Sequence, residues 1–548
     1  MKTKNIIAYA AIGIIVIAVA YSVLFRTPNN SGNPSPQSTD QLIANSKAAA
    51  IEQYQKQFCG LNTTTNSTGY ITEYKLPATC EMPLGILVDS QAGKIWYVST
   101  KQGTLGSYNL ATNKFDKEVT IPVWEARNNP TDNSQVWSVK ADKKGNIWFT
   151  DEKQNAIWKY SKSLGSFEMY KVPESPKAFG TAYPVSIDFD SKGNLYFVGI
   201  RSPAIWFGNI TQMKSGTTNG ITKIPLPTTG FKGIDPSLLS VGSIAVDNKR
   251  DAVWISMLSF PNKGEILRYN IASKTFDSFT MPAGLNSPVG VAISNDGNLW
   301  VTDHATSTFF MLNASNGKTT TYATSTASPR IYGVNNVPQA AYTLPYWIES
   351  GSAGSLWFNE HEGNKIARFV PSNNTLYEYW IPTQSKLWGN CPPNSKTCGI
   401  ANTLQFSNGE NGQTWFTEWS ENKIGRLNTN YNQLPFTISV SPQQLILKRG
   451  QTAEIKVDIS AARIPQSSTN STVEMVASGT FTPGGNLGNS TGTFSQASFP
   501  MPAPSTSKQV SFIFTPAINQ NPGEYMLMIG TQNNEVGILK AVKVRVNS

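Results

Sequence analysis

The chain has 548 residues, more than one hydrophobic core usually organises, so its length predicts two or three domains. Only 15% of the residues are charged and 39% are hydrophobic, while Gly, Pro, Ser, Thr and Asn are abundant. This mixture favours short strands and turns over long helices. The formal net charge is +10, but the chain has no basic run with interleaved aromatic residues. It therefore lacks the pattern typical of a nucleic-acid-binding protein.

The first 26 residues predict a membrane anchor. Lys2 and Lys4 precede an apolar run from Ile6 to Phe25, and about 20 apolar residues suffice to cross a bilayer. Positive charge before the run keeps the N-terminus in the cytoplasm and places the rest of the chain outside. A cleaved signal peptide is the alternative, because residues 18–20 resemble a small-residue cleavage site. The run continues apolar to Leu24, which favours the anchor and a single-pass protein of the cell membrane.

Cysteines and glycosylation sequons agree with an extracellular location. The cysteines lie in two close pairs, Cys59 with Cys80 and Cys391 with Cys398, and oxidising compartments favour disulfides in such loops. Four cysteines allow three pairings, so a cross-link between the two pairs is the alternative. Sequons of the Asn-x-Ser/Thr type predict a glycoprotein, and they begin at Asn62, Asn66, Asn209, Asn313, Asn373, Asn470 and Asn489.

Residues 27–69 are expected to form a linker and a stalk. Residues 27–38 are rich in Pro, Ser and Asn. From Asp40 to Phe58 the apolar positions recur at helical spacing, which predicts a short helix that packs on the next domain or spaces it from the membrane.

From about residue 70 to residue 430 the chain repeats a small residue, an aromatic anchor and an alternating strand. The anchors are Trp96, Trp148, Tyr196, Trp254, Trp300, Trp357 and Trp415. Repeats of about 40 to 50 residues built from short strands indicate the blades of a β-propeller. The pattern therefore predicts a seven-bladed propeller with four strands in each blade.

The last repeat lacks an outer strand, and the segment before the first repeat supplies the missing pattern. Residues 70–77 match the outer strands of the other repeats. We expect this segment to complete the last blade, because ring closure hides the edges that would otherwise pair with other chains. From residue 436 to residue 548 short alternating strands predict an immunoglobulin-like β-sandwich without catalytic residues. The fold class is therefore all-β, preceded by one transmembrane helix.

Several repeat phrases resemble those of the virginiamycin B lyase, or streptogramin lyase, family. They are residues 148–151, residues 357–360 with 363–366, and residues 415–418 with 421–426. The resemblance covers roughly residues 70–430 and implies a seven-bladed propeller. For active members it implies a metal-dependent elimination that linearises cyclic depsipeptides, with histidines near the start of inner strands and carboxylates that hold Mg²⁺.

The sequence departs from that pattern at the implied histidines. Tyr346 stands where the sixth repeat would carry one, and residues 401–405 of the seventh repeat contain none. Elimination needs a base for the α-proton, so the departure favours a protein without lyase activity. Glu418 is the carboxylate that matches a family position.

The two histidines of the chain, His304 and His361, follow anchored strands and are expected on one rim of the propeller. Five acidic residues end or follow anchored strands in the same way and are expected on the same rim: Asp151, Glu152, Asp303, Glu360 and Glu418. This rim predicts a site at the channel mouth. Its expected members are His361 as the catalytic candidate, Glu360 and Glu418 as ligands of a divalent cation (Mg or Ca), and Arg330, Tyr332, Tyr346 and Trp388 as ligand-binding residues. The alternative is that these residues are polar turns.

Two functions follow from these observations. The leading hypothesis is a membrane-anchored extracytoplasmic binding or scaffold protein that recognises an extracellular small molecule, glycan or protein. The alternative is a metal-dependent lyase or a lactonase-like hydrolase that acts at the channel mouth.

Overall fold

The structure is a computed structural model that describes residues 39–61, 64–173, 182–259, 262–326, 342–388, 391, 398–410, 412–430, 432–465, 472–478, 487 and 489–548. Within these residues the fold is all-β apart from one α-helix and several short 3-10 helices. The helices are α3 (Thr39–Phe58), η2 (Glu125–Asn128), η3 (Thr229–Phe231), η4 (Pro236–Leu238), η5 (Ser352–Gly354), η6 (Pro371–Asn373) and η7 (Trp419–Glu421).

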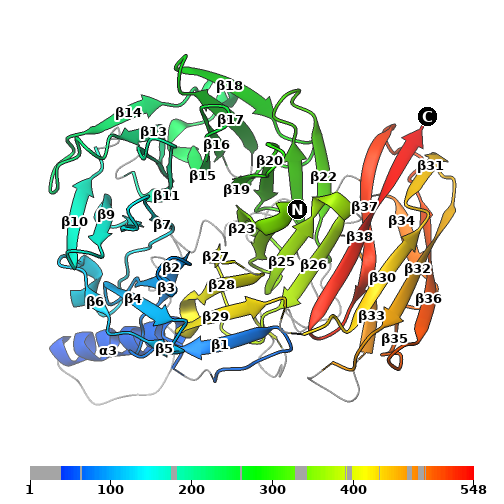
Figure 1. The fold of residues 1–548 in the computed structure, drawn as a ribbon, viewed down its shortest axis with the longest axis horizontal. Helices are drawn as coiled ribbons and strands as arrows, with labels where there is room; N and C mark the ends of the chain where they lie inside the picture. The colour runs from blue at the N-terminus through cyan, green and yellow to red at the C-terminus, as the bar shows by residue number, and fades with distance from the viewer. Residues whose placement is uncertain are drawn as a thin grey trace.

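The repeats fold into antiparallel sheets in which consecutive strands pair, and the sheets lie around a common centre (Figure 1). The first sheets comprise β2 (Pro83–Asp89), β3 (Lys94–Ser99), β4 (Thr104–Asn109), β5 (Lys114–Phe115) and β6 (Val119–Thr120); β7 (Val139–Ala141), β8 (Ile147–Asp151), β9 (Ala156–Ser161) and β10 (Ser166–Lys171); and β11 (Pro184–Phe189), β12 (Leu195–Gly199), β13 (Ser202–Gly208) and β14 (Ile221–Pro225). The next comprise β15 (Ser240–Asp247), β16 (Ala252–Ser259), β17 (Lys263–Asn270) and β18 (Thr275–Thr280); β19 (Pro288–Ile293), β20 (Leu299–Asp303), β21 (Thr308–Leu312) and β22 (Thr319–Ala323); and β23 (Pro345–Ser350), β24 (Leu356–Glu360), β25 (Lys365–Val370) and β26 (Thr375–Trp380).

The aromatic anchors hold neighbouring sheets together. Trp148 is 1% exposed and packs with Ile187 and Phe197 of the next sheet. Its indole Nε1 donates a hydrogen bond of 2.9 Å to Asp142 Oδ2, which satisfies the polar end of a buried ring. Gly145 before it has a φ of 76°, the left-handed region in which glycine carries no steric penalty. The repeated glycine and Trp therefore mark a turn and the core residue that follows it.

The N-terminal strand joins the last repeat. β1 (Ile71–Lys75) pairs antiparallel with β29 (Lys423–Asn428), and the sheet continues through β28 (Gln413–Glu418) to β27 (Phe406–Asn408). The disulfide between Cys59 and Cys80 brackets β1. The second disulfide joins Cys391 to Cys398, so the expected neighbour pairing is confirmed.

The C-terminal strands form two facing sheets, and one of them is continuous with the propeller. One sheet orders β30 (Phe436–Ser441), β32 (Ala453–Ala461), β36 (Ser507–Thr515) and β34 (Thr491–Phe494). The other contains β33 (Thr472–Ala477), β35 (Ser498–Pro500), β37 (Gly523–Gln532) and β38 (Val536–Asn547), with β31 (Gln444–Lys448) parallel to β38. β38 also pairs with β26, and so extends a propeller sheet into the C-terminal part (Figure 1).

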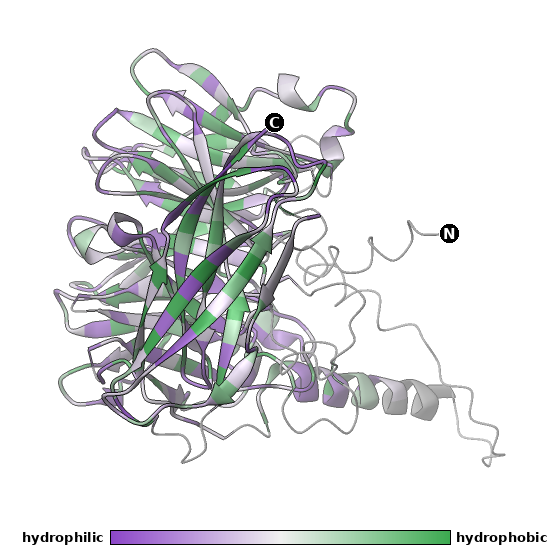
Figure 2. Ribbon diagram, turned by 90° about the vertical axis from the view of Figure 1, so that its right-hand side faces the viewer, coloured by the Kyte–Doolittle hydropathy of each residue, from purple (hydrophilic) through white to green (hydrophobic). Residues whose placement is uncertain are grey.

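Helix α3 covers the segment for which the sequence predicts a helix. It projects from the body of the molecule and contacts it at its C-terminal end (Figure 2). Tyr54 and Phe58 are buried there, and Phe58 contacts Trp388 and Trp419 at ring-centroid distances of 5.5 and 5.4 Å. Among the described residues no helix is long and apolar enough to cross a membrane. The span predicted at residues 6–25 lies outside the described residues.

Candidate functional site

The two histidines meet at one end of the inner strands. His304 follows β20 and His361 follows β24, and the centroids of their rings are 5.7 Å apart in a stacked arrangement. Tyr346, the second residue of the inner strand β23, lies 4.5 Å from His304 and 6.4 Å from His361 between ring centroids. All three side chains are buried. The common rim expected for the two histidines is therefore confirmed.

Polar atoms in this group lack hydrogen-bond partners. Nε2 of His361 lies 3.0 Å from Oδ1 of Asn402, and because an amide oxygen only accepts, the Nε2–H is the donor. Nδ1 of His361, Nδ1 of His304 and Nδ2 of Asn402 are buried without a partner. Buried polar atoms normally have one, so these atoms offer one amide donor and ring nitrogens to a bound molecule.

The opposite side of the group comes from another sheet. Trp137, just before β7, lies 5.9 Å from Tyr346 between ring centroids. The backbone N–H of Glu152 donates to the carbonyl of Gln135 at 3.2 Å, and one side-chain oxygen of each residue, Oε2 of Glu152 and Oε1 of Gln135, is also buried without a partner. We call Gln135, Trp137, Glu152, His304, Tyr346, His361 and Asn402 the upper site.

Burial controls the charge of the upper site. Desolvation, and then the neighbouring His361, lower the pKa of His304 to about 3, so its ring is neutral at physiological pH. Desolvation raises the pKa of Glu152 to about 7, although Arg201 and Trp137 act in the opposite direction. Desolvation and then Glu152 raise the pKa of Tyr346. Within the upper site, His304 and Tyr346 are therefore uncharged at physiological pH, and Glu152 titrates near neutrality.

The carboxylates expected to hold a cation lie beside lysines instead. Oε2 of Glu360 is 3.6 Å from Nζ of Lys365, and Oε2 of Glu418 is 3.9 Å from Nζ of Lys423. The two glutamates belong to different sheets. Across the described part of the chain, no group of three or more His, Cys, Asp or Glu side chains is arranged to hold a metal ion. The structure thus does not gather Glu360 and Glu418 into a metal centre.

Other residues expected on the rim have structural roles. Asp151 accepts hydrogen bonds from Ser134 Oγ at 2.6 Å and Trp158 Nε1 at 2.9 Å. Asp303 accepts a 2.7 Å hydrogen bond from the backbone N–H of Ser287. Trp388 packs in the aromatic cluster with Phe58 and Trp419, rather than in the upper site. Arg330 and Tyr332 lie outside the described residues.

Sequence reasoning missed Gln135, Trp137 and Asn402 as members of the site. Asn402 stands in the segment where the family resemblance places a histidine, so its position was a usable signal. Gln135 and Trp137 carry no such signal, because the contact of Trp137 with Tyr346 depends on two sheets that are distant in the sequence.

The fold and the upper site define a β-propeller with a buried polar cluster at one end of its inner strands. Residues 123–385 match the model of the virginiamycin B lyase family. This match confirms the resemblance seen in the repeats, and the propeller is virginiamycin B lyase-like. No curated protein matches the sequence.

Solved structures of that family are similar to this chain. A streptogramin B lyase is 22% identical with a TM-score of 0.49, covering 66% of this chain and 97% of the other. Virginiamycin B lyase from Staphylococcus aureus is 22% identical with a TM-score of 0.48, covering 65% and 98%. A catalytically inactive form of the S. aureus enzyme with quinupristin is 23% identical with a TM-score of 0.47, covering 65% and 98%.

Proposed function

We propose that this chain is a membrane-anchored, extracytoplasmic binding protein that holds a neutral, hydrogen-bonding ligand at the upper site. In this proposal the repeats form a closed seven-bladed propeller, and the C-terminal sheets form an immunoglobulin-like sandwich that supports it. The ligand is an extracellular small molecule, or an exposed part of a glycan or protein.

The observation that carries the proposal is the set of buried, unpartnered polar atoms around Tyr346. Nδ1 of His304, Nδ1 of His361, Nδ2 of Asn402 and Oε2 of Glu152 belong to this set. An unpaired buried polar group costs about 1–3 kcal/mol. Several such groups in one place are explained when a ligand or ordered water completes their hydrogen bonds.

The same geometry supports binding over catalysis. A general base works best when its pKa lies near the working pH, and the pKa of His304 is about 3. Tyr346 has a pKa raised above its ordinary value, so it does not take up a proton as phenolate. Glu152, with a pKa of about 7, has a suitable value but occupies no histidine position implied by the family.

Quinupristin provides the test against the lyase alternative. We expect the full-length protein with Mg²⁺ to leave quinupristin intact in mass spectrometry of the reaction mixture, because other residues stand at Tyr346 and 401–405, where the resemblance implies histidines. Rapid ring opening that is lost in the His361→Ala variant would replace the binding proposal with the lyase. His361 is the residue that favours this alternative, since Asn402 orients its ring.

Native mass spectrometry of the protein extracted from its own membranes provides the positive test. We expect a small-molecule adduct on the wild-type protein and its loss in His304→Ala. Lys144→Met, which alters an exposed lysine in a hairpin turn, is the matched control and should keep the adduct. Equal adducts on His304→Ala and wild type would remove the upper site from the proposal.

A further inference from the structure

The strand register places one residue of each inner strand at a common level of the ring. Each of these residues pairs directly with an aromatic anchor. They are Leu87, Lys140, Asp188, Ala245, Ala292, Glu349 and Ser407. Lys140, Asp188 and Glu349 are charged, and the two alanines between Asp188 and Glu349 in ring order are small. At this level of the ring, the inner strands therefore carry three charged side chains, and the two small alanines leave space between Asp188 and Glu349.

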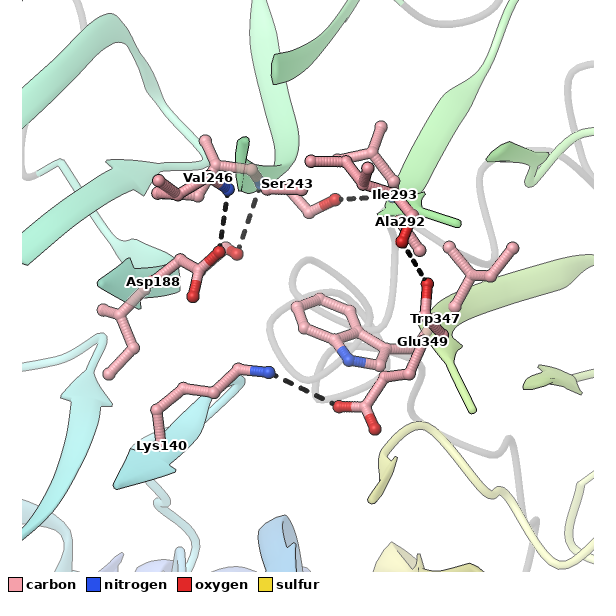
Figure 3. Close-up of a pocket in the computed structure, with 16 residues that line it drawn as sticks. Lys140, Asp188, Ser243, Val246, Ala292, Ile293, Trp347 and Glu349 are labelled. Atoms are coloured by element: carbon pink, nitrogen blue, oxygen red, sulfur yellow. Dashed lines mark hydrogen bonds and ion pairs between the residues drawn. The ribbon is translucent and has the colours of Figure 1, made fainter. Parts of the chain in front are cut away.

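A cavity of about 280 Å³ occupies that space. Its walls include Lys140, Asp188, Ser243, Trp347 and Glu349. Figure 3 shows that the indole of Trp347 points into the space bordered by Lys140, Asp188 and Glu349. Ligand pockets begin at about 300 Å³, so the cavity suits a single small molecule. We call it the lower site.

The lower site is distinct from the upper site. Tyr346 and Trp347 are successive residues of β23 and lie where the pairing with β24 shifts register between Pro345 and Ile348. Tyr346 contacts Trp137 and the histidines, whereas Trp347 lines the cavity. None of the residues that line the cavity belongs to the upper site.

Each of the two carboxylates of the lower site accepts a backbone hydrogen bond from the sheet next to its own. Oδ2 of Asp188 accepts a 2.8 Å hydrogen bond from the N–H of Val246, and Oε2 of Glu349 accepts one of 3.1 Å from Asn408. These bonds orient the carboxylates and leave lone pairs for a ligand, because a carboxylate has about four acceptor positions.

Lys140 is paired loosely. Its Nζ lies 3.5 Å from Oε1 of Glu349, whereas charged hydrogen bonds are usually about 2.7–2.9 Å. The side chain of Lys140 remains 34% exposed. An ammonium has three donors, so Lys140 can donate to a ligand while it stays near Glu349.

We propose that the lower site binds a neutral polyol of the size of one sugar ring. Each hydroxyl group donates and accepts, so a polyol can donate to Asp188 and Glu349 and accept from Lys140. Its apolar ring face can lie on the indole of Trp347. Asp188 and Glu349 both face Lys140, so the two carboxyl groups disfavour an anion, and a neutral polyol brings no further charge that the site must neutralise.

Saturation-transfer NMR on the full-length protein tests the proposal, with D-glucose and myo-inositol as probes and acetate and glycine as comparisons. We expect transfer to at least one polyol and none to acetate or glycine. Lys140→Met and Glu349→Gln should each weaken polyol binding at least tenfold. Lys144→Met, in the same sheet but in an exposed turn, should bind as the wild type does.

Two further variants separate this site from misfolding and from the upper site. Trp347→Leu should weaken polyol binding, and the melting temperature of every variant without ligand shows whether it is folded. His361→Ala should leave polyol binding unchanged, because it alters the upper site. The proposal is overturned if neither polyol binds, if acetate or glycine binds better, or if folded Lys140→Met and Glu349→Gln bind polyol as the wild type does.

Discussion

Two buried lysines each lie between two carboxyl groups. Nζ of Lys365 lies 2.9 Å from Oε2 of Glu378 and 3.6 Å from Oε2 of Glu360. In the next repeat Nζ of Lys423 lies 3.0 Å from Glu73 and 3.9 Å from Glu418. All these side chains are 0% exposed. One positive charge cannot neutralise two buried negative charges, so each group favours an additional bound proton.

That proton is held by the glutamate farther from the lysine. Burial, followed by the charge of Glu378, raises the pKa of Glu360 well above its ordinary value. Burial and then Glu73 raise the pKa of Glu418 in the same way. In the unfolded chain both carboxyls titrate near about pH 4.3. Their contribution to stability is therefore full below that pH and is lost as the pH rises through the folded-state pKa.

Glu360→Gln should make the free energy of unfolding less dependent on pH. Glutamine donates a hydrogen bond to Glu378 as a protonated carboxyl would, but it cannot ionise. Between about pH 5 and about pH 8 the wild type should lose stability more steeply than the variant, by up to about 1.4 kcal/mol per pH unit. Urea unfolding at several pH values measures this difference.

Glu52→Gln is the matched control for that measurement. Glu52 lies on α3, where its side chain is 71% exposed and pairs with Lys56. The free energy of unfolding of Glu52→Gln should depend on pH in the same way as that of the wild type. Parallel profiles for wild type and Glu360→Gln would show that Glu360 is not the group that holds the proton.

At the scale of elements, β1 protects the last propeller sheet. Deleting residues 59–80 removes the partner of β29, the Glu73 carboxylate that faces Lys423 and the disulfide at Cys59. We expect the deletion to unfold the propeller or to lower its melting temperature strongly, because β29 becomes an open edge. Circular dichroism during heating measures the effect.

A deletion within α3 is the control for the effect of simply removing residues near the N-terminal end of the described chain. Residues 46–49 are exposed, whereas Tyr54 and Phe58 at the other end of the helix are buried. Deleting residues 39–50 should therefore shift the melting temperature much less than deleting residues 59–80. An unchanged melting temperature after the larger deletion would contradict the expectation that β1 stabilises the last propeller sheet.

The pairing of β26 with β38 makes the C-terminal strands part of the propeller's stability. Gly530 in β37 packs so closely on β38 that an added Cβ would lie 1.9 Å from the carbonyl oxygen of Ile538. Gly530→Ala should therefore cost about 1–3 kcal/mol. Because β38 pairs with β26, we expect the melting transition of the whole molecule to move to lower temperature.

Gly523 in the same strand is the matched control. An added Cβ there would meet its nearest atom, Oη of Tyr525, at 3.5 Å, an ordinary contact. Gly523→Ala should change the stability by less than about 0.5 kcal/mol. A shift confined to a separate transition of the C-terminal strands would show that β26 and β38 do not couple the two parts.

At the scale of the whole molecule, the predicted anchor determines where the protein resides. We expect the mature protein to retain Lys2 and Ile6 and to sediment with membranes, because the apolar run is long enough to cross a bilayer. N-terminal sequencing of the purified protein checks this. A sequence that begins at Tyr21 would establish a cleaved signal peptide.

Local patterns in the sequence predicted much of the fold. The small residue before each anchor, the buried aromatic anchor and the alternating strands recur along the chain, and each depends on residues near one another. The pairing of the 70–77 segment with the last repeat, observed over Ile71–Lys75, and the neighbouring disulfides also followed from pattern. The continuity of β26 with β38 did not, because no local signal states which edge a distant strand will join.

The candidate site was predicted less completely, for the same physical reason. The sequence by itself determined that His304 and His361 follow equivalent strands of successive repeats, and hence that they share a rim. Only the tertiary structure decided that Trp137 meets Tyr346 from another sheet, and that Glu360 and Glu418 face lysines rather than a common cation. The position of a residue within its repeat determines how far along the strand its side chain lies. The neighbours and the charge of that side chain depend on which sheets converge there and how completely they exclude water.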